Sequence, residues 1–381
     1  MKLLKKLLKA FIILFTLLIA ILYVTDTDYL IKAVRTIYAQ GYTTAFLDDY
    51  KKFDNQTIDN STPQPWINHK NYNTAKETEV LSKANKDYGT IAYVIIKNDS
   101  IWFENYYDGY NENSKSNSFS MAKSYVSGLL GKAIMEGHIK NLDQSVCDFL
   151  PDFCDGLAKK MTVGDLSTMS SGTNWDEAYY SPLSITTRAY FDDDLAKVMN
   201  GLKVVDEPGK AFKYASGDTQ MLAMVIEKAT GKKLYNYFEE SFWKPLGSEN
   251  QTLWQVDSED YDLVKAYCCI ASNAKDFARF GKLYKDNGKW KGKQILDSTF
   301  VAKSLTPKYD PVYGFGWWLK NHNGKDFKMM RGHLGQYVIV QPEDNVIIVR
   351  LGHQKSPDEG IGAYTKDISI YIDEAYKMMN N

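Results

Sequence analysis

The hydrophobic residues of this 381-residue chain follow a strand pattern near both ends and a helical pattern between them. Residues 89–110 (GTIAYVIIKNDSIWFENYYDGY) contain two β-rich runs around Asn98-Asp99-Ser100, which predicts a β-hairpin. In residues 118–137, apolar side chains recur at helical spacing with polar residues between them, which predicts a helix with one buried face. Residues 141–300 are mainly helical pattern and loop.

Strand patterns return near the carboxyl terminus. Residues 313–320, 327–342 and 345–354 predict consecutive antiparallel strands joined by the short turns HNGKD and PEDN, and an amphipathic helix is expected in the 360s and 370s. Strands at both ends of a helical middle favour an α+β fold. We expect one antiparallel sheet built from both chain ends, flanked by helices, together with a helical subdomain.

The first 24 residues resemble an export signal. Lys2, Lys5, Lys6 and Lys9 precede 15 uncharged residues, and no small-x-small cleavage site or lipid-attachment cysteine follows. We therefore expect a signal anchor at 1–24 that places the lysines in the cytoplasm and the body on the extracytoplasmic, periplasmic side of the cytoplasmic membrane. Secretion after cleavage at an unrecognised site is the alternative. A polar, turn-rich linker and amino-terminal extension is expected at 25–85, and a catalytic domain at 86–381.

Charge and composition narrow the class of partner. Beyond the four amino-terminal lysines, the chain carries 42 basic and 47 acidic residues, and no basic stripe indicates a nucleic-acid partner. The sequence has no CxxC, no HExxH and no cluster of its five histidines, so no metal site is expected. Of the four cysteines, Cys147, Cys154, Cys268 and Cys269, the adjacent last two are interpreted as small apolar core residues, and the disulfide pairing is left open.

Ser120 and Lys123 are the first candidates for catalysis. Residues three apart lie on the same face of a helix, so the lysine amine can reach the serine hydroxyl. Serine needs a base to act as a nucleophile, and a lysine that is desolvated by burial can lose its proton near neutral pH. The motif alone is weak evidence, because the same spacing occurs at Ser241 and Ser272, where a structural role explains it better.

Two further segments carry candidate chemistry. In Tyr214-Ala215-Ser216-Gly217-Asp218, the tyrosine could relay the proton of the nucleophile and Ser216 could position substrate. The alternative is that Ser216 or Asp218 only caps the following helix. The segment Gly332-His333-Leu334-Gly335-Gln336 enters an alternating strand, where small residues would let a substrate lie along the backbone.

In this order, the three motifs resemble those of the serine β-lactamase and penicillin-binding protein superfamily. The resemblance is closer to its class C β-lactamase-related branch, which includes family VIII esterases and hydrolases of linear 6-aminohexanoate oligomers. The stretches LSTMSSGTNWDE, PGKAFKYASGDTQ, AKDFARFGKLY and YGFGWWL add to it, and the similarity covers about residues 85–379. The resemblance implies a β-lactamase/transpeptidase-like fold.

The resemblance also implies the roles of the site residues. Ser120 would be acylated, Lys123 and Tyr214 would share the role of general base, and the backbone N–H groups of Ser120 and Gln336 would form the oxyanion hole. The remaining residues expected to bind substrate are Ser216, His333, Gly335, Trp175 and Asn174. No metal or organic cofactor is implied.

Two departures from the family pattern affect the expected substrate. Ser216 stands where the superfamily usually has asparagine, and His333 stands in place of the lysine of Lys-Thr-Gly. A mostly neutral imidazole is a weaker anchor for the carboxylate of a penicillin. We therefore expect a serine hydrolase of small-molecule amides, esters or peptides with poor β-lactamase activity. A penicillin-recognising sensor or binding protein that is acylated without turnover is the alternative, and a catalytically dead scaffold is a further rival.

Overall fold

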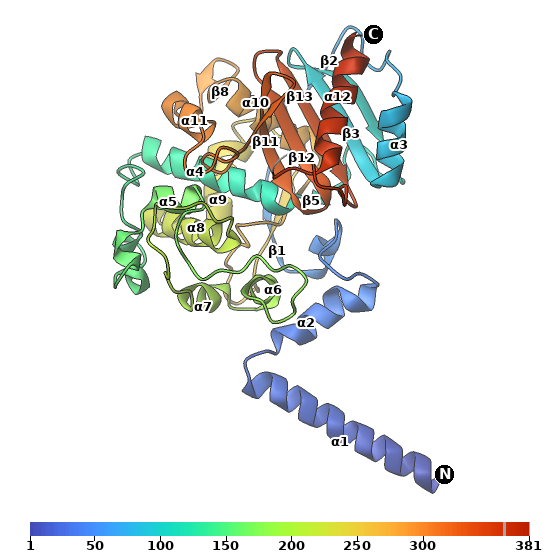
Figure 1. The fold of residues 1–381 in the computed structure, drawn as a ribbon, viewed down its shortest axis with the longest axis vertical. Helices are drawn as coiled ribbons and strands as arrows, with labels where there is room; N and C mark the ends of the chain where they lie inside the picture. The colour runs from blue at the N-terminus through green and yellow to red at the C-terminus, as the bar shows by residue number, and fades with distance from the viewer. Residues whose placement is uncertain (361–362, 381) are drawn as a thin grey trace.

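The computed structural model describes residues 1–360 and 363–380, and its largest sheet is built from both ends of the chain (Figure 1). Seven strands lie in the order β10-β11-β12-β13-β3-β4-β2, and all neighbours are antiparallel except β2 and β4. The strands are β2 (Ile67–Asn68), β3 (Thr90–Lys97), β4 (Ser100–Tyr106), β10 (Trp318–His322), β11 (Lys325–Gly332), β12 (Gln336–Gln341) and β13 (Val346–Gly352). Pairing of β3 with β13 joins the two ends, which confirms the predicted α+β architecture.

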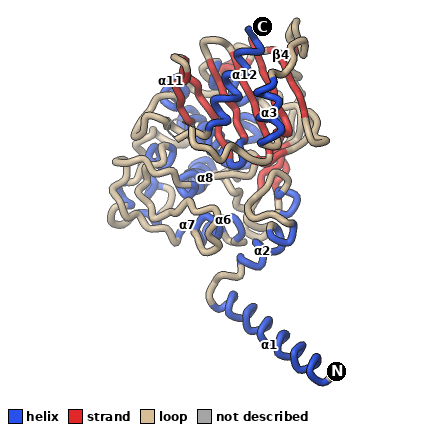
Figure 2. Tube along the Cα trace, turned by 45° about the vertical axis from the view of Figure 1, so that its right-hand side comes forward, coloured by secondary structure: helices blue, strands red, loops and turns tan. Residues whose placement is uncertain are grey.

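Both faces of this sheet are buried because its strands alternate between two cores. On β3, Tyr93 and Ile95 pack with α3 (Glu79–Asp87) and α12 (Lys366–Asn380), which lie together over one face (Figure 2). Val94 and Ile96 point the other way, into the core shared with α4 (Ala122–Met135) and α10 (Ala274–Lys285). This two-residue alternation fixes the register of the sheet between its helical layers.

The helical part surrounds α4, which is buried on nearly every side. Gly128 and Gly131 let aromatic rings approach the α4 backbone, since an added Cβ would lie 2.7 Å from Phe280 and 2.3 Å from Phe300. The other helices are α5 (Val163–Ser167), α6 (Ile185–Phe191), α7 (Leu195–Asn200), α8 (Ser216–Thr230), α9 (Leu234–Phe238) and α11 (Ser298–Ser304). The helix α8 ends before Gly231, which adopts the left-handed φ of 68° that is common at a helix C-terminus.

Several short helical turns connect these elements. They are η1 (Tyr38–Gln40), η2 (Asp49–Lys52), η3 (Phe119–Met121), η4 (Val146–Asp148), η5 (Pro151–Phe153), η6 (Ala158–Lys160), η8 (His333–Gly335) and the π-helical η7 (Glu239–Trp243). The turn η3 leads directly into α4, so together they form the helix that was predicted for residues 118–137. The segment at the amino end of this helix therefore carries Ser120.

A second sheet ties the amino-terminal extension to the body. Its order is β1-β6-β7-β5, where β1 is Asn55–Ile58, β5 is Ser116–Asn117, β6 is Thr252–Gln255 and β7 is Ile270–Ser272. A separate hairpin consists of β8 (Lys289–Trp290) and β9 (Lys293–Gln294).

The division of the chain at residues 24 and 85 stays a prediction. The helix α3 runs across the second of these boundaries.

Two helices precede this sheet. The helix α1 (Lys2–Val24) projects away from the body, has no buried residue, and is the one described helix long and apolar enough to cross a membrane (Figures 1 and 2). After a short link, α2 (Tyr29–Thr36) docks on the body. Asp26 forms ion pairs with Arg188 and Lys197 at 2.5 and 2.8 Å, and the hydroxyl of Tyr29 donates to a backbone carbonyl of the loop before α6 at 3.0 Å. These contacts hold α2 beside α6.

Candidate active site

Ser120 lies in η3, at the amino end of the central helix and on the wall of a cavity. The preceding residue, Phe119, has a φ of 45°, a left-handed conformation that costs a non-glycine residue about 1–3 kcal/mol. Neighbouring hydrogen bonds hold this backbone in place: the N–H of Phe119 donates to Asn117 at 2.9 Å, and Ser118 exchanges two hydrogen bonds with Ile270 on β7. Ser120 is thus presented by a constrained turn.

Lys123 is in position to exchange a proton with Ser120. Its Nζ lies 2.9 Å from the Ser120 Oγ and also donates to the backbone carbonyl of Tyr267 at 2.9 Å. Only 3% of Lys123 is exposed, and this burial lowers the pKa of its amine to about 8, with the charge of Glu177 acting in the opposite direction. A substantial fraction of this amine is therefore unprotonated at neutral to mildly alkaline pH.

Tyr214 lies on the other side of the lysine. Its ring centroid is 5.1 Å from the Lys123 Nζ, and the ring packs against Trp318 with 5.3 Å between centroids. Burial, followed by the charge of Glu177, raises the pKa of Tyr214, while hydrogen bonding to Ser120 acts in the opposite direction. The phenol is therefore protonated at neutral pH, so it can donate a proton but is a poor base.

The sequence interpretation missed Glu177, which organises this side of the site. Its carboxylate accepts hydrogen bonds from the backbone N–H and the hydroxyl of Ser216 at 2.8 and 2.6 Å. It also accepts from Trp175 Nε1 at 2.7 Å and from the hydroxyl of Tyr179 at 2.5 Å. Ser216 is the first residue of α8, where a negative charge is favourable. Glu177 ends the stretch LSTMSSGTNWDE, but a pairing with a helix 39 residues away has no local sequence signal.

His333 lines the cavity beside Tyr179, whose hydroxyl donates to the Glu177 carboxylate. Its ring lies edge-on to Phe119 and stacks on Tyr179, with centroids 5.5 and 5.3 Å apart, and its Nε2 is 3.5 Å from the hydroxyl of Thr44. Burial, followed by the charge of Lys355, lowers the pKa of His333 to about 4. The imidazole is therefore neutral at pH 7.

Gln336 and Gly335 lie behind the cavity wall. The side chain of Gln336 is fully buried and exchanges hydrogen bonds with the backbone of Gly352 on β13 at 2.7 and 3.0 Å. Gly335 has a φ of 85°, and an added Cβ would lie 2.3 Å from the guanidinium of Arg350. Both residues shape the turn between β11 and β12, and the oxyanion role of the Gln336 backbone N–H stays a prediction.

Trp175 and Asn174 hold the loop that carries Glu177. Trp175 is buried, and its ring lies against Gly217, where an added Cβ would be 2.5 Å away. Asn174 is exposed and exchanges two 2.9 Å hydrogen bonds with the backbone of Lys203. Neither belongs to the described residues that line the cavity, so their contribution to substrate binding stays a prediction.

All four cysteines are paired. Cys147 bonds to Cys154, and Cys268 bonds to Cys269, which supplies the pairing that the sequence left open. Cys268 and Cys269 are both buried, as expected for core residues. A bond between adjacent residues closes no long chain loop, so its effect is local. It directly follows Tyr267, whose carbonyl accepts the hydrogen bond from Lys123. The sequence alone does not distinguish a disulfide between these adjacent cysteines from two buried free thiols.

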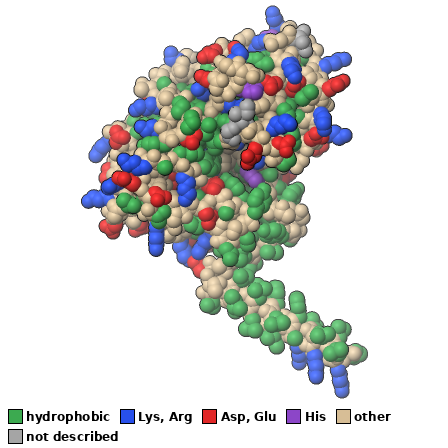
Figure 3. All heavy atoms as spheres, viewed as in Figure 1, with side chains coloured by type: hydrophobic (Ala, Val, Ile, Leu, Met, Phe, Trp, Pro, Cys, Tyr) green, Lys and Arg blue, Asp and Glu red, His purple; other side chains and the backbone are tan. Residues whose placement is uncertain are grey.

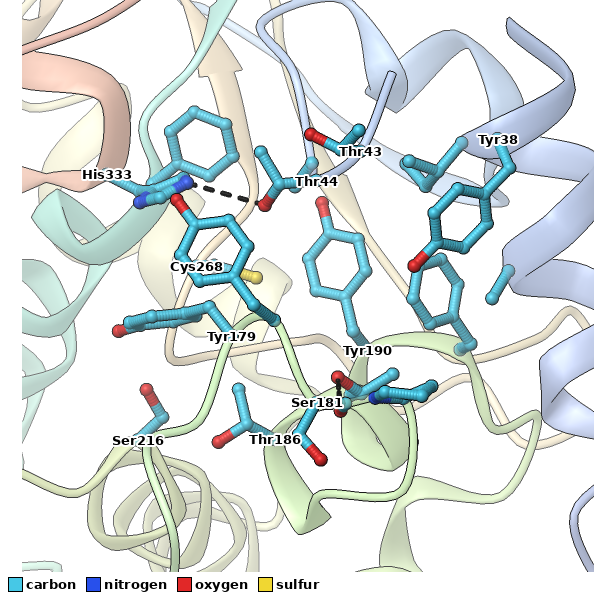
Figure 4. Close-up of a pocket in the computed structure, with 18 of the residues that line it drawn as sticks. Tyr38, Thr43, Thr44, Tyr179, Ser181, Thr186, Tyr190, Ser216, Cys268 and His333 are labelled. Atoms are coloured by element: carbon cyan, nitrogen blue, oxygen red, sulfur yellow. Dashed lines mark hydrogen bonds between the residues drawn. The ribbon is translucent and has the colours of Figure 1, made fainter. Parts of the chain in front are cut away.

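The cavity beside Ser120 has a volume of about 300 Å³. Figure 4 shows His333, Tyr179 and Ser216 on one side and Tyr38 of the amino-terminal extension on the other, with Tyr190 between them. The structure thus brings Ser120, Ser216 and His333 to one cavity, with Lys123 next to the serine. Among the described residues, no group of three or more His, Cys, Asp or Glu side chains is placed to hold a metal ion.

Comparisons with known proteins agree with this fold. A family model described as Beta-lactamase matches residues 78–370. The 6-aminohexanoate-dimer hydrolase of Paenarthrobacter ureafaciens is 22% identical over 71% of this chain and 74% of its own. Two further curated relatives are matched over only 57% and 59% of their own length.

Solved structures give the same result for the fold. A Bacillus anthracis protein provisionally named a 6-aminohexanoate-dimer hydrolase superposes with a TM-score of 0.71 at 20% identity, over 86% of this chain and 91% of its own. A family VIII carboxylesterase superposes with a TM-score of 0.58 at 16% identity, over 79% of this chain and 98% of its own. Both are neighbours of the kind that the three sequence motifs indicated.

Proposed function

The chain belongs to the beta-lactamase family and is a serine hydrolase of that family, and we propose that it cleaves amide or ester bonds through an acyl-enzyme on Ser120. The observation that carries this proposal is the 2.9 Å distance between the Ser120 hydroxyl and a buried lysine amine whose pKa is lowered to about 8. Such a pair provides a nucleophile and its base without any further group.

In the proposed first step, the unprotonated amine of Lys123 takes the proton of Ser120 while the Oγ attacks the carbonyl carbon of the substrate. The backbone N–H groups of Ser120 and Gln336 stabilise the negative charge that develops on the carbonyl oxygen. When the bond to the leaving group breaks, the leaving amine or alkoxide takes the proton held by Lys123, and the acyl group remains on Ser120. Water then attacks the ester while the unprotonated Lys123 takes one of its protons. The carboxylic acid leaves as this proton passes to the Ser120 Oγ, which restores the hydroxyl and the free amine.

Tyr214 takes part in this sequence as a neutral hydroxyl. Because its pKa is raised, the tyrosinate is unfavourable, and Lys123 is the better base. The phenol is well placed to donate a proton to the leaving group and to recover it from the lysine. Glu177 supports the arrangement by holding Ser216 at the start of α8.

We also propose that α1 anchors the enzyme in the cytoplasmic membrane with the body on the extracytoplasmic side. The lysines at its amino end and its apolar length support this orientation. Cleavage of the segment and release of the body is the alternative, and the mass of the mature chain distinguishes the two.

The base assignment predicts a pH profile. For an ester without ionisable groups, kcat/KM rises about tenfold per pH unit below pH 8 and levels off above it, because only unprotonated Lys123 accepts the serine proton. Initial rates between pH 5.5 and 9.5 test this profile. A rate that is independent of pH in this range would contradict Lys123 as the base.

Glu177→Gln provides the control for that profile. The carboxylate raises the pKa of Lys123, so its neutral replacement moves the midpoint of the profile to lower pH. Glutamine can still accept from the backbone N–H of Ser216, so this hydrogen bond can persist. A midpoint that stays in place would show that the titrating group is not Lys123.

Penicillins and cephalosporins are expected to be poor substrates. The neutral imidazole of His333 offers no cation for the carboxylate of these antibiotics. We expect kcat/KM for nitrocefin to stay at least about 1,000-fold below the diffusional ceiling of about 10⁸–10⁹ M⁻¹s⁻¹. An activated ester assayed on the same preparation shows that the enzyme is competent, and nitrocefin turnover near the ceiling would overturn the expectation.

A further inference from the structure

The amino-terminal extension forms one wall of the cavity that holds the nucleophile. Along α2 and just after it, Leu30, Ala33, Val34 and Ile37 all face this cavity. Their spacing of three and four residues places them in one stripe along the helix. Ser120 also lines this cavity, so the stripe and the nucleophile share one space.

The chemistry of the lining is apolar. Among the described residues that line the cavity, none has an acidic, lysine or arginine side chain, and His333 is neutral at pH 7. Phe119 and Phe191 add aromatic rings to the lining. Tyr190 and the Cys268 sulfur also line the cavity (Figure 4). A volume of about 300 Å³ is at the lower end of the range of small-molecule sites, about 300–1,000 Å³. Such a space favours hydrocarbon over a charged or strongly hydrated group.

The rim of the cavity is also apolar and lies close to α1. Beyond α1, six of the twelve large exposed apolar side chains in the described structure lie on α2, on the segment after it or in the loop before α6. They are Val34, Tyr38, Tyr42, Tyr179, Tyr180 and Leu183. Figure 3 shows apolar side chains continuing from α1 over the α2 region onto the body. Tyrosines of this kind are common at membrane interfaces.

The connection between the two helices is short. Only residues 25–28 separate α1 from α2, and the ion pairs of Asp26 hold this link to α6 and α7. If α1 spans a membrane, the cavity rim stays near its surface. The link and α2 together would then connect the membrane anchor to the body and form part of the wall of the substrate cavity.

We propose that this cavity binds an alkyl chain of the substrate, so that the enzyme acts on esters or amides that carry a hydrocarbon chain of several carbons. This inference rests on the proposed serine hydrolase function and names the substrate class of that site. The α2 stripe contacts the chain, while Ser120 attacks the carbonyl to which the chain is attached.

Chain-length series on the full-length protein in phosphatidylcholine nanodiscs test the proposal. The acyl side is varied in 4-nitrophenyl esters from acetate to octanoate, and the alcohol side in acetates from ethyl to octyl. In at least one series, kcat/KM is expected to rise about two- to fourfold for each methylene that the cavity accommodates, since each is removed from water. No rise in either series would overturn the proposal.

Val34→Asp tests whether α2 is responsible for the rise. Val34 is 56% exposed at the cavity wall, so a carboxylate there is compatible with folding but unfavourable beside a hydrocarbon chain. The ratio of octanoate to acetate kcat/KM is expected to fall at least tenfold in this variant. Because each variant is judged by its own octanoate-to-acetate ratio, differences in the amount of folded enzyme cancel. Partition of the esters into lipid is the same for all variants, so it does not affect the comparison between them.

Val80→Asp is the matched control. Val80 is 50% exposed on α3, which covers the far face of the main sheet, and its replacement is expected to leave the ratio unchanged. An equal fall in both variants, or no fall in Val34→Asp, would overturn the assignment to α2. Acetate ester hydrolysis that depends on Ser120 reports the proposed function separately, so a flat series with active enzyme contradicts only the chain-binding site.

An experiment with two arms distinguishes whether the alkyl substrate reaches the enzyme through the membrane or from water. In the first, 4-nitrophenyl palmitate is dissolved in the same vesicles as the reconstituted enzyme, and in the second it is in separate vesicles. Hydrolysis in the first arm alone supports delivery through the membrane, and equal rates in both arms support capture from water. Absence of hydrolysis in both arms, with octanoate also no better than acetate, would count against an alkyl substrate altogether.

Discussion

Replacing Ser120 by alanine lowers ester hydrolysis by at least about 10⁴-fold, because the acyl-enzyme cannot form without the hydroxyl. The 2.9 Å contact with Lys123 is lost with the hydroxyl, but the turn around Ser118 and Phe119 keeps its hydrogen bonds. The variant is therefore expected to fold. The measurement is a time course with an activated ester, together with intact mass and peptide mapping after incubation with a fluorophosphonate.

Ser241→Ala is the control for this experiment. Ser241 has the same spacing to a lysine, but it is buried in η7, and Lys244 pairs with Glu239 at 2.6 Å instead. This variant is expected to keep the adduct on Ser120. A stable adduct without turnover in the wild-type chain would favour a sensor or binding protein, and an adduct on another residue would contradict the assignment of the nucleophile.

Much of the fold was readable from the period of the hydrophobic residues. The hairpin predicted in residues 89–110 is β3 and β4, and the run predicted at 345–354 contains β13. The run predicted at 327–342 forms two strands, β11 and β12, because the turn η8 interrupts it. β12 and β13 are buried throughout and are joined by the short polar turn PEDN, so their boundary is clear. The strand predicted at 313–320 begins only at Trp318, because Gly316 turns the chain, with a φ of 74°, against Ser127 of α4.

Helix ends were less predictable. Ser272 was expected to have a structural role, and as a serine just before a helical run it is a natural N-cap, but it belongs to β7, and Asn273 caps α10 through its side chain at 2.9 Å. Both side chains can cap a helix, so the sequence does not choose between neighbours. The choice follows from the pairing of β7 with β5 and β6, which includes residues from distant parts of the chain.

The spacing alone locates a Ser-x-x-Lys motif at Ser120, but it does not show that this motif, rather than those at Ser241 and Ser272, is catalytic. Three segments share its spacing, and only tertiary contacts distinguish them. Lys275 forms ion pairs with Glu104 and Glu112 near the surface, whereas Lys123 is buried and faces Ser120. The Ser-x-x-Lys pattern therefore predicts a shared helix face, while burial decides whether the lysine can act as a base.

The least predictable parts of the site come from distant segments. Glu177 accepts a hydrogen bond from the start of α8, 39 residues further along the chain, and the α2 stripe lines the same cavity as Ser120 although the two are more than 80 residues apart. A turn-rich, polar extension gave no indication that one short helix within it would line the cavity. These contacts depend on where the small sheet places the extension, which local patterns do not encode.

Lys123→Met is expected to lower kcat/KM about 10³-fold, since a positioned base contributes about 10²–10⁴-fold. The residual activity should also lose the rise towards pH 8 that we assign to the amine. The rate, the pH profile and the thermal midpoint are measured on the same preparations. Lys244→Met, at the partly exposed lysine of the second Ser-x-x-Lys segment, is the control and should retain rate and profile.

The thermal stability of the Lys123→Met variant distinguishes a catalytic role of Lys123 from a structural one. Its pKa is about 8 in the folded chain against 10.5 in water, so below pH 8 the buried ammonium opposes folding by an amount on the order of 3 kcal/mol at most. This cost falls between pH 8 and 10.5 as the amine loses its proton in the folded state. Methionine removes the cost and loses two hydrogen bonds, so at pH 7 the variant should melt no lower than the wild type. A large loss of stability together with the loss of rate would instead indicate that Lys123 mainly holds Tyr267 and the turn around Ser120 in place.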